Sequence, residues 1–206
     1  MREAAEEWGI TVSDEAFSTA LSEIQAQAEV NGGYDAWLLA NQYTADEFAD
    51  ILRNQLLASA VIEEVVRSVP PTAEQVRARY IVVDDPALAQ SLLDQARGGA
   101  NFAELASANS LDQTTAPNGG DLDFIIRGWL FRPQVEDVIF ALQPDQISEV
   151  IPVDIGNGQT SYYLVQVVER DPARPLNSAQ RDALTRRTIE EWLGARLASA
   201  DIQTFE

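Results

Sequence analysis

The sequence predicts an α+β fold in which one small sheet-containing module lies between helical segments. Three observations carry this prediction. Apolar residues follow helical spacing along the N-terminal stretch, and a β-branched run at Tyr80–Val83 then interrupts that spacing. Short strand-like runs alternate with helix signals as far as residue 168. After a proline-rich break, helical spacing returns over 178–199.

Cap signals divide the N-terminal stretch into helices. Gly9 is typical of a helix C-cap, and Ser13 is typical of an N-cap. Thr44 and Glu47 have the spacing of a capping box before a long apolar stretch. We therefore expect helices over about 2–8, 14–30, around Trp37 and over 45–68.

The middle of the chain has the pattern of a β-α-α-β-α-β-β module with a four-stranded sheet. Pro70 and Pro71 end the long helix, and the cap-like residues Thr72–Gln75 predict one more short helix before the module. Tyr80–Val83 is the first strand. The elements that follow are expected as helices over about 86–97, 102–108 and 133–141, and as strands near 122–126, 150–153 and 162–168.

A final helix follows a predicted linker. Asp171–Pro175 has the composition of a turn or linker, and Asn177 is an N-cap signal for a helix over about 178–199. The apolar residues of this helix need an apolar partner. We expect that partner to be the helical segment 14–68.

Composition excludes several classes of function. The chain has 206 residues and a formal net charge of −19, which opposes binding to nucleic acid. It contains no cysteine and no histidine, and all its basic residues are arginine, so most covalent nucleophiles and metal ligands are missing. Its acids lack the spacing of a calcium loop. We expect no metal, no small-molecule cofactor and no nucleic-acid partner.

The first residues indicate a fragment. No apolar run is long enough to span a membrane, and no signal peptide is recognisable. Met1–Gly9 nevertheless starts as if inside a helix, without a cap. We therefore expect an anchor or a signal to lie outside this sequence.

The order of motifs over residues 100–169 resembles the parvulin family of peptidyl-prolyl isomerases. These motifs are Asn101–Ala106, Ser110–Asp112, Gly119–Leu122, Arg127-Gly128, Val135–Leu142, Gln146–Ser148 and Ser161–Val167. The flanking helical segments resemble those of the SurA/PrsA/PpiD-type extracytoplasmic foldases, in which a parvulin module is inserted into a helical chaperone lobe. This resemblance implies a chaperone lobe formed by 1–76 and 171–206, and a parvulin-like domain over 77–170.

The resemblance also implies a site. Parvulins usually carry two histidines beneath the catalytic pocket, and here Tyr80 and Tyr163 stand in their places. Asp112 stands where the family has a catalytic Asp or Cys. The implied proline slot comprises Leu122, Leu130 or Phe131, Val135 and Phe140, with Trp129 beside it. In the alternative interpretation these residues only pack the domain, and Asp112 is a turn residue.

Three functions remain open on the sequence. The preferred hypothesis is a foldase-type chaperone that binds unfolded, nascent or proline-containing polypeptide, with weak or lost isomerase activity. The second is an active isomerase that uses Asp112. The third is a non-catalytic scaffold. The resemblance places the chain outside the cytoplasm, in the periplasm or at the cell surface, and leaves its oligomeric state open.

Overall fold

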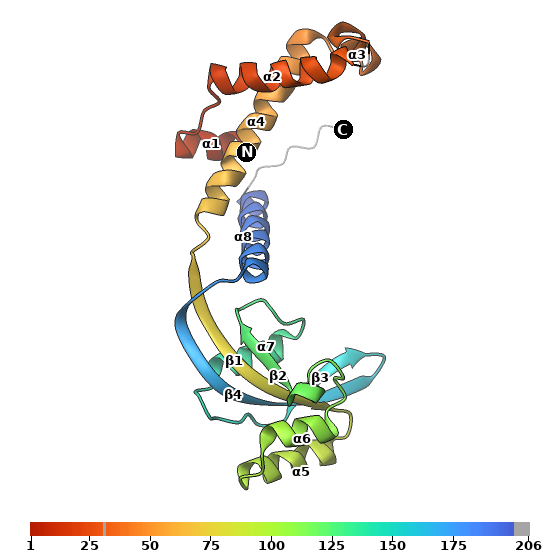
Figure 1. The fold of residues 1–206 in the computed structure, drawn as a ribbon, viewed down its shortest axis with the longest axis vertical. Helices are drawn as coiled ribbons and strands as arrows, with labels where there is room; N and C mark the ends of the chain where they lie inside the picture. The colour runs from red at the N-terminus through yellow and green to blue at the C-terminus, as the bar shows by residue number, and fades with distance from the viewer. Residues whose placement is uncertain (31, 200–206) are drawn as a thin grey trace. The chain divides into compact units, whose positions relative to one another are not determined.

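The computed structural model describes residues 1–30 and 32–199 and divides into two compact units (Figure 1). The helical unit comprises Met1–Val69 and Thr185–Glu206, and the sheet unit comprises Pro70–Leu184. The predicted α+β class is confirmed. The units divide at 69/70 and 184/185, whereas the sequence suggested boundaries at 76/77 and 170/171. Within the described ranges, no helix is long and apolar enough to cross a membrane.

The helical unit contains the helices that the cap signals predicted. Gly9 ends the first helix with φ +66°. Ser13 Oγ accepts a hydrogen bond from the Ala16 amide, and Thr44 and Glu47 form both bonds of a capping box. The helices are α1 (Arg2–Trp8), α2 (Asp14–Glu29), α3 (Tyr34–Ala40) and α4 (Ala45–Arg67), together with the end of α8 (Ser178–Ser199).

Two apolar clusters stabilise this unit. In the first, Trp37 of α3 packs edge-on against Phe48 of α4, with ring centroids 5.0 Å apart. In the second, Trp192 of α8 packs against a small buried group from α1 and α4, comprising Ala4, Ala5 and Val61. The predicted contact between the final helix and the N-terminal helices is thus present at Trp192. The head of α8 belongs to the sheet unit, where Gln180 is buried.

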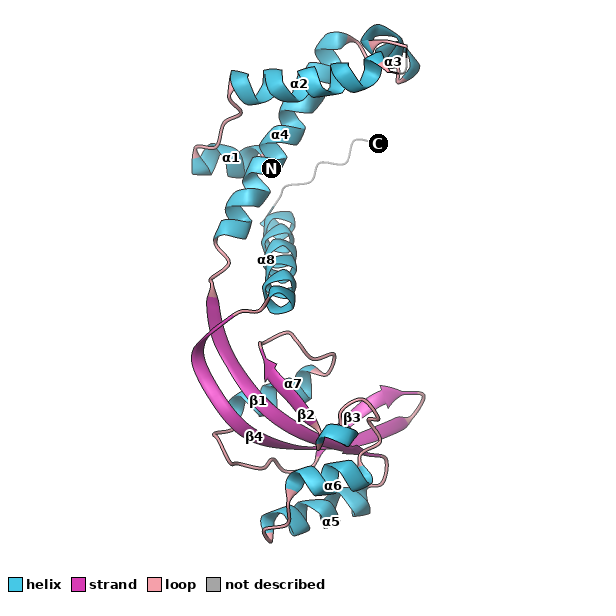
Figure 2. Cartoon of the chain, in the orientation of Figure 1, coloured by secondary structure: helices cyan, strands magenta, loops and turns pink. Residues whose placement is uncertain are grey.

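The sheet unit has four antiparallel strands in the order β2-β1-β4-β3 (Figure 2). The predicted succession β-α-α-β-α-β-β is confirmed, with one short 3₁₀ turn, η1, added before β2. The elements are β1 (Thr72–Val83), α5 (Pro86–Arg97), α6 (Phe102–Asn109), η1 (Ala116–Asn118), β2 (Asp121–Ile125), α7 (Pro133–Ala141), β3 (Ile151–Gly156) and β4 (Gln159–Pro175).

Two local predictions were wrong for one physical reason. Thr72–Gln75 is not a helix but the start of β1, and Asp171–Pro175 is not a linker but the end of β4. The two segments pair with each other, Thr72 opposite Pro175. The register shifts between Ala73 and Gln75, and such irregular points accommodate prolines in strands. Pairing between segments so distant in the chain overrides their local turn and cap signals.

The sheet presents two faces with separate apolar cores. On the α7 face, Val76, Ala78, Val165 and Val167 pack against α7. On the α5/α6 face, Ile81, Val83 and Leu164 pack against α5 and α6. Alternate residues of β1 and β4 supply the two cores because side chains alternate across a strand. Figure 2 shows α7 on one side of the sheet and the α5–α6 pair on the other.

Candidate functional site

Most of the predicted site residues gather on the α7 face. Six of them belong to or pack against its core cluster: Tyr80, Leu122, Leu130, Val135, Phe140 and Tyr163. Of the two candidates for one position of the predicted slot, Leu130 packs against this cluster, while Phe131 is 97% exposed. Trp129 is also exposed. Val135 has no exposed surface, so it packs behind the wall of the site.

Asp112 joins this group through Tyr80. The Tyr80 hydroxyl donates a short hydrogen bond to Asp112 Oδ2. The same oxygen accepts from Thr115 Oγ1 at 2.7 Å, and Asp112 Oδ1 accepts from the Thr114 amide at 3.0 Å. Asp112 is thus both the turn residue of one interpretation and the polar neighbour of Tyr80 in the other. Its two carboxylate oxygens accept three hydrogen bonds.

These contacts set the charge states at the site. Burial by itself would raise the pKa of Asp112, but the hydrogen bonds from Tyr80, Thr115 and Thr114 outweigh it and hold that pKa below its usual value. Burial, reinforced by the hydrogen bond to Asp112, raises the pKa of Tyr80 far above its usual range. At neutral pH the pair is therefore a neutral phenol that donates to a carboxylate.

Tyr163 contacts Tyr80 through its ring. The ring centroids lie 5.9 Å apart with an interplanar angle of 62°, an edge-to-face arrangement. Tyr80 lies on β1 and Tyr163 on β4, and these two strands are neighbours in the sheet. The two tyrosines therefore form an aromatic floor on the α7 face, with one hydroxyl tied to Asp112.

Two glycines bring the Asp112 loop close to its neighbours, Gly119 to α6 and Gly120 to β1. The Gly120 carbonyl accepts a hydrogen bond from the Tyr80 amide at 3.0 Å. A Cβ on Gly120 would lie 2.1 Å from the Tyr80 carbonyl oxygen, and one on Gly119 would lie 2.5 Å from Ala103 Cβ. Both glycines have φ near +70°. Only glycine combines this backbone angle with so close an approach.

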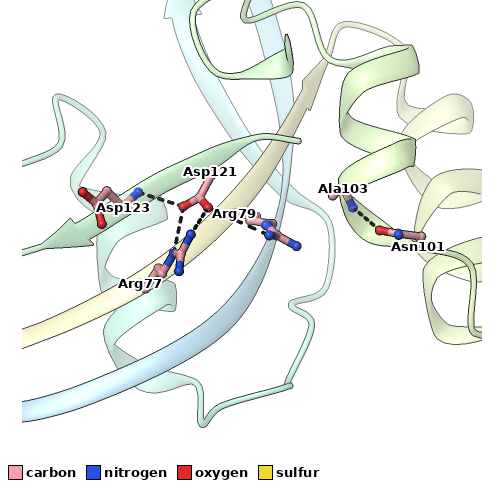
Figure 3. A network of polar contacts seen from close by, with 6 residues as sticks. All are labelled: Arg77, Arg79, Asn101, Ala103, Asp121 and Asp123. Atoms are coloured by element: carbon pink, nitrogen blue, oxygen red, sulfur yellow. Dashed lines mark hydrogen bonds and ion pairs between the residues drawn. The ribbon is translucent and has the colours of Figure 1, made fainter. Parts of the chain in front are cut away.

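An ion-pair network fixes the start of β2, which carries Leu122. Asp121 Oδ2 accepts from Arg77 at 2.6 Å and lies 3.9 Å from Arg79, and Asp121 Oδ1 accepts from the Asp123 amide (Figure 3). Burial opposes ionisation of Asp121, but these donors lower its pKa overall. The network holds β2 to β1 beside Tyr80.

Sequence reasoning missed Glu136, a buried acid on α7. Its exposed fraction is 7%, and its carboxylate accepts from the Gly128 amide at 2.6 Å and the Leu130 amide at 3.0 Å. The signal was available, because Glu136 falls on the apolar side of α7 between Val135 and Ile139. An acid at such a position needs buried donors.

A second missed residue, Arg170, ties α7 to the sheet. Its guanidinium donates to the carbonyls of Phe140 and Leu142, each at 2.7 Å, and also pairs with Glu74. These carbonyls lie at the C-terminal end of α7, where cations are favourable. Arg170 thereby fixes the backbone of Phe140, whose ring also lies 4.4 Å from the Arg127 guanidinium carbon.

This arrangement suits non-covalent recognition of an apolar group. Leu122, Leu130 and Phe140 lie around two tyrosine rings, with one polar cluster at Asp112. Within residues 1–30 and 32–199, no group of acids has the geometry of a metal site. The groups present can bind, orient and desolvate a ring or an aliphatic side chain.

Comparison with known proteins gives a consistent family assignment. Residues 75–171 match the family described as the PPIC-type PPIASE domain. The chain is 32% identical to a foldase protein PrsA of Halalkalibacterium halodurans over 82% of its length, covering 55% of that protein. It is 29% identical to a parvulin-like PPIase of Rickettsia bellii over 65% of its length, covering 44% of that protein. It thus spans about half the length of these relatives.

The fold has relatives among solved structures. A peptidylprolyl isomerase (PrsA) of Bacillus cereus superposes with a TM-score of 0.62 at 20% identity, over 95% of this chain and 78% of that one. The PrsA structure of Bacillus anthracis has a TM-score of 0.50 at 20% identity, over 98% and 95% of the two chains. Residues 75–171 therefore match the family of PPIC-type PPIASE domains, in a chain that is similar in sequence to PrsA foldases and in fold to PrsA structures.

Proposed function

We propose that the chain is a foldase-type chaperone that binds unfolded or proline-containing polypeptide, and that its parvulin domain isomerises prolyl bonds slowly or not at all. The observation that carries this proposal is the Tyr80–Asp112 hydrogen bond beneath an apolar wall. The wall supplies a surface for proline, while the polar groups nearest to it are already bonded to each other. Similarity to PrsA foldases supports the chaperone part.

Prolyl isomerisation makes modest chemical demands. The barrier of about 18–20 kcal/mol comes from the partial double bond of the peptide group. A protein lowers it by binding the twisted amide better than the planar one, which requires a grip on the proline ring and a suitable polar environment for the carbonyl. Leu122, Leu130 and Phe140 are the residues that we assign to the grip.

Two features favour slow catalysis. Asp112 accepts three hydrogen bonds, so turning it toward a substrate amide would break existing contacts. Val135 also stands where the resemblance implies an aromatic side chain. Because Val135 is fully buried, it offers proline no contact, and the grip lacks one large apolar side chain, whose burial stabilises by about 1.5–3 kcal/mol. Because about 1.4 kcal/mol of lost transition-state stabilisation lowers a rate tenfold, this change alone slows isomerisation by about 10- to 100-fold.

The test is a comparison of isomerisation rates by NMR exchange on a short Xaa-Pro peptide. The variants are the wild type, Asp112→Ala and the double variant Tyr80→His/Tyr163→His. We expect slow or undetectable exchange in the wild type together with binding of the peptide. Rapid wild-type exchange that Asp112→Ala abolishes would instead establish the active-isomerase hypothesis. If the wild type shows no binding of the peptide and no exchange, the result would favour the scaffold hypothesis.

The chaperone part has its own test. We expect the protein to suppress aggregation of an unfolded client at stoichiometric concentration without nucleotide, because the sequence has no phosphate-binding loop. Absence of any effect on the aggregation of several clients would contradict the chaperone proposal.

We further propose an extracytoplasmic location, with an anchor outside these residues, on the basis of the similarity to foldases. Fractionation of the native cells, followed by immunodetection, tests this location.

A further inference from the structure

The loop between β2 and α7, residues 126–132, presents its residues in two directions. Leu130 packs against the α7-face core, whereas Trp129 and Phe131 on either side are exposed. Gly128 has φ +81°, and the Trp129 amide donates to the Ile126 carbonyl at 3.2 Å. Such a loop needs an anchor to hold one apolar side chain inward between two that point outward.

Glu136 is that anchor. Its carboxylate accepts the amides of Gly128 and Leu130, one on each oxygen, at 2.6 and 3.0 Å. Hydrogen bonds to a charged acceptor are stronger than neutral ones, and a buried acceptor makes the geometry costly to change. Glu136 also lies near the N-terminal end of α7, where the helix dipole favours a negative charge.

The side chain of Glu136 acts on the site through the loop. The backbone atoms that it holds flank Trp129 and include the amide of Leu130, which packs against the same cluster as Leu122 and Phe140. Arg127, at the other end of the same loop, stacks over the Phe140 ring. The loop therefore contacts α7 at both Glu136 and Phe140.

We propose that Glu136 is a positioning residue of the proline site, whose carboxylate fixes the loop so that Leu130 forms one wall of that site. This inference rests on the proposed function, since it concerns how the parvulin domain grips proline. It assigns no chemical step to Glu136. It predicts that affinity for a proline peptide depends on the acceptor capacity of this side chain.

The decisive variant is Glu136→Gln, which keeps the shape but replaces one acceptor oxygen by a donor NH₂ group. One loop amide then loses its acceptor. We expect the dissociation constant of a short Xaa-Pro peptide, measured by NMR titration of the full chain, to rise about tenfold, or about 1.4 kcal/mol. The amide proton resonances of Gly128 and Leu130 are expected to move upfield, while those of α5 stay unchanged.

Two further variants separate positioning from general destabilisation. Glu149→Gln is the matched control, because Glu149 is an exposed acid that pairs with Arg97 away from the loop. It is expected to bind the peptide like the wild type. Leu130→Ala removes the wall directly. If Glu136 acts through Leu130, Glu136→Gln has little further effect on affinity in the Leu130→Ala background.

Each outcome decides the matter. Wild-type affinity in Glu136→Gln, or effects of the two substitutions that simply add, would overturn the inference and leave the proposed function standing. A wild type that binds no proline peptide would overturn both. If Glu136→Gln does not fold, Glu136→Asp replaces it in the comparison with Leu130→Ala and is judged by the same criterion. This variant keeps the carboxylate but shortens its reach.

Discussion

The cores on the two faces of the sheet differ in the aromatic and charged residues around them. The buried core on the α5/α6 face is aliphatic apart from Phe102, and four partly buried apolar residues pack against it, Leu105, Ile147, Val150 and Tyr162. On the α7 face, the buried valines continue into partly exposed residues, including Tyr80 and Leu122. Buried or half-buried polar groups are arranged around this second core, among them Asp112, Glu136 and Arg170.

This difference separates stability from recognition. A fully buried aliphatic core stabilises the domain and offers a ligand nothing to contact. A core whose edge is half exposed and framed by fixed polar groups leaves apolar surface for a ligand and orients it. Substitutions on the α5/α6 face should therefore change stability alone, and substitutions at the edge of the α7 core should change binding more than stability.

The largest effect is expected at Gly120, where α6 and β1 meet. Gly120→Ala would bring a Cβ within 2.1 Å of the Tyr80 carbonyl oxygen, so the loop or the strand must move. Gly158→Ala is a matched control, because Gly158 has the same φ of +71° and nothing within 4 Å. We expect Gly120→Ala to lower the free energy of unfolding by more than about 4 kcal/mol, and Gly158→Ala by about 1 kcal/mol. Equal losses in urea denaturation would contradict the close packing.

A pair of leucine truncations tests the two faces directly. Leu93→Ala on the α5/α6 face should lower the free energy of unfolding by about 2–5 kcal/mol because it leaves a cavity. Leu122→Ala at the edge of the α7 core should cost less stability and weaken the binding of a proline peptide. Both quantities are measured for both variants, by urea denaturation and NMR titration. The distinction fails if Leu93→Ala weakens binding by the folded protein as much as Leu122→Ala does.

Asp112 should make the α7 face sensitive to acid. Its pKa is lowered in the folded state, so its contribution to stability is present above the unfolded pKa, near 4, and is lost as pH falls through the lower folded value. We expect Asp112→Asn to lower the free energy of unfolding by about 1.5–3 kcal/mol at pH 7, as for hydrogen bonds to a charged group. The difference from the wild type should shrink steadily below about pH 4. A difference independent of pH would show that the carboxylate charge contributes nothing.

The smallest effect on stability is expected at Phe131. Its side chain is 97% exposed, so Phe131→Ser should change the free energy of unfolding by less than about 0.5 kcal/mol. Thermal denaturation checks this value. A drop of several degrees would mean that Phe131 packs against the domain in solution. Unchanged stability with weaker client binding would extend the recognition surface outward from Leu130.

Most of the fold could be predicted because its signals are local. The cap of α2 at Ser13, the capping box at Thr44 and the proline at the start of α5 each specify a boundary through contacts within a few residues. The ends of β1 and β4 could not be found in this way. They become strands only by pairing with each other, and Thr72–Gln75 taken alone has the pattern of a helix start.

The same distinction between local signals and contacts of distant segments applies to the residues of the site. The apolar wall and the two tyrosines follow the order of the family motifs, so sequence alone brought most of them together. It could not tell which of Leu130 and Phe131 packs against the core, because that depends on how the loop is anchored. Glu136 and Arg170 act by accepting from or donating to backbone atoms of other segments, and the sequence does not identify those partners. The position of Glu136 on the apolar side of α7 marked only its burial.

The placement of Trp192 has a consequence for synthesis on the ribosome. The cluster of Ala4, Ala5 and Val61 is completed by Trp192, which lies 125 positions beyond Arg67, the end of α4. At about 5–20 residues per second, the helical unit waits on the order of 6–25 seconds for its last helix. The sheet unit is continuous in the chain and is complete at Leu184, shortly before Trp192 is added. During this time the growing chain exposes the apolar helix surface that Trp192 later covers, which is the kind of surface that we propose the finished protein binds in its clients.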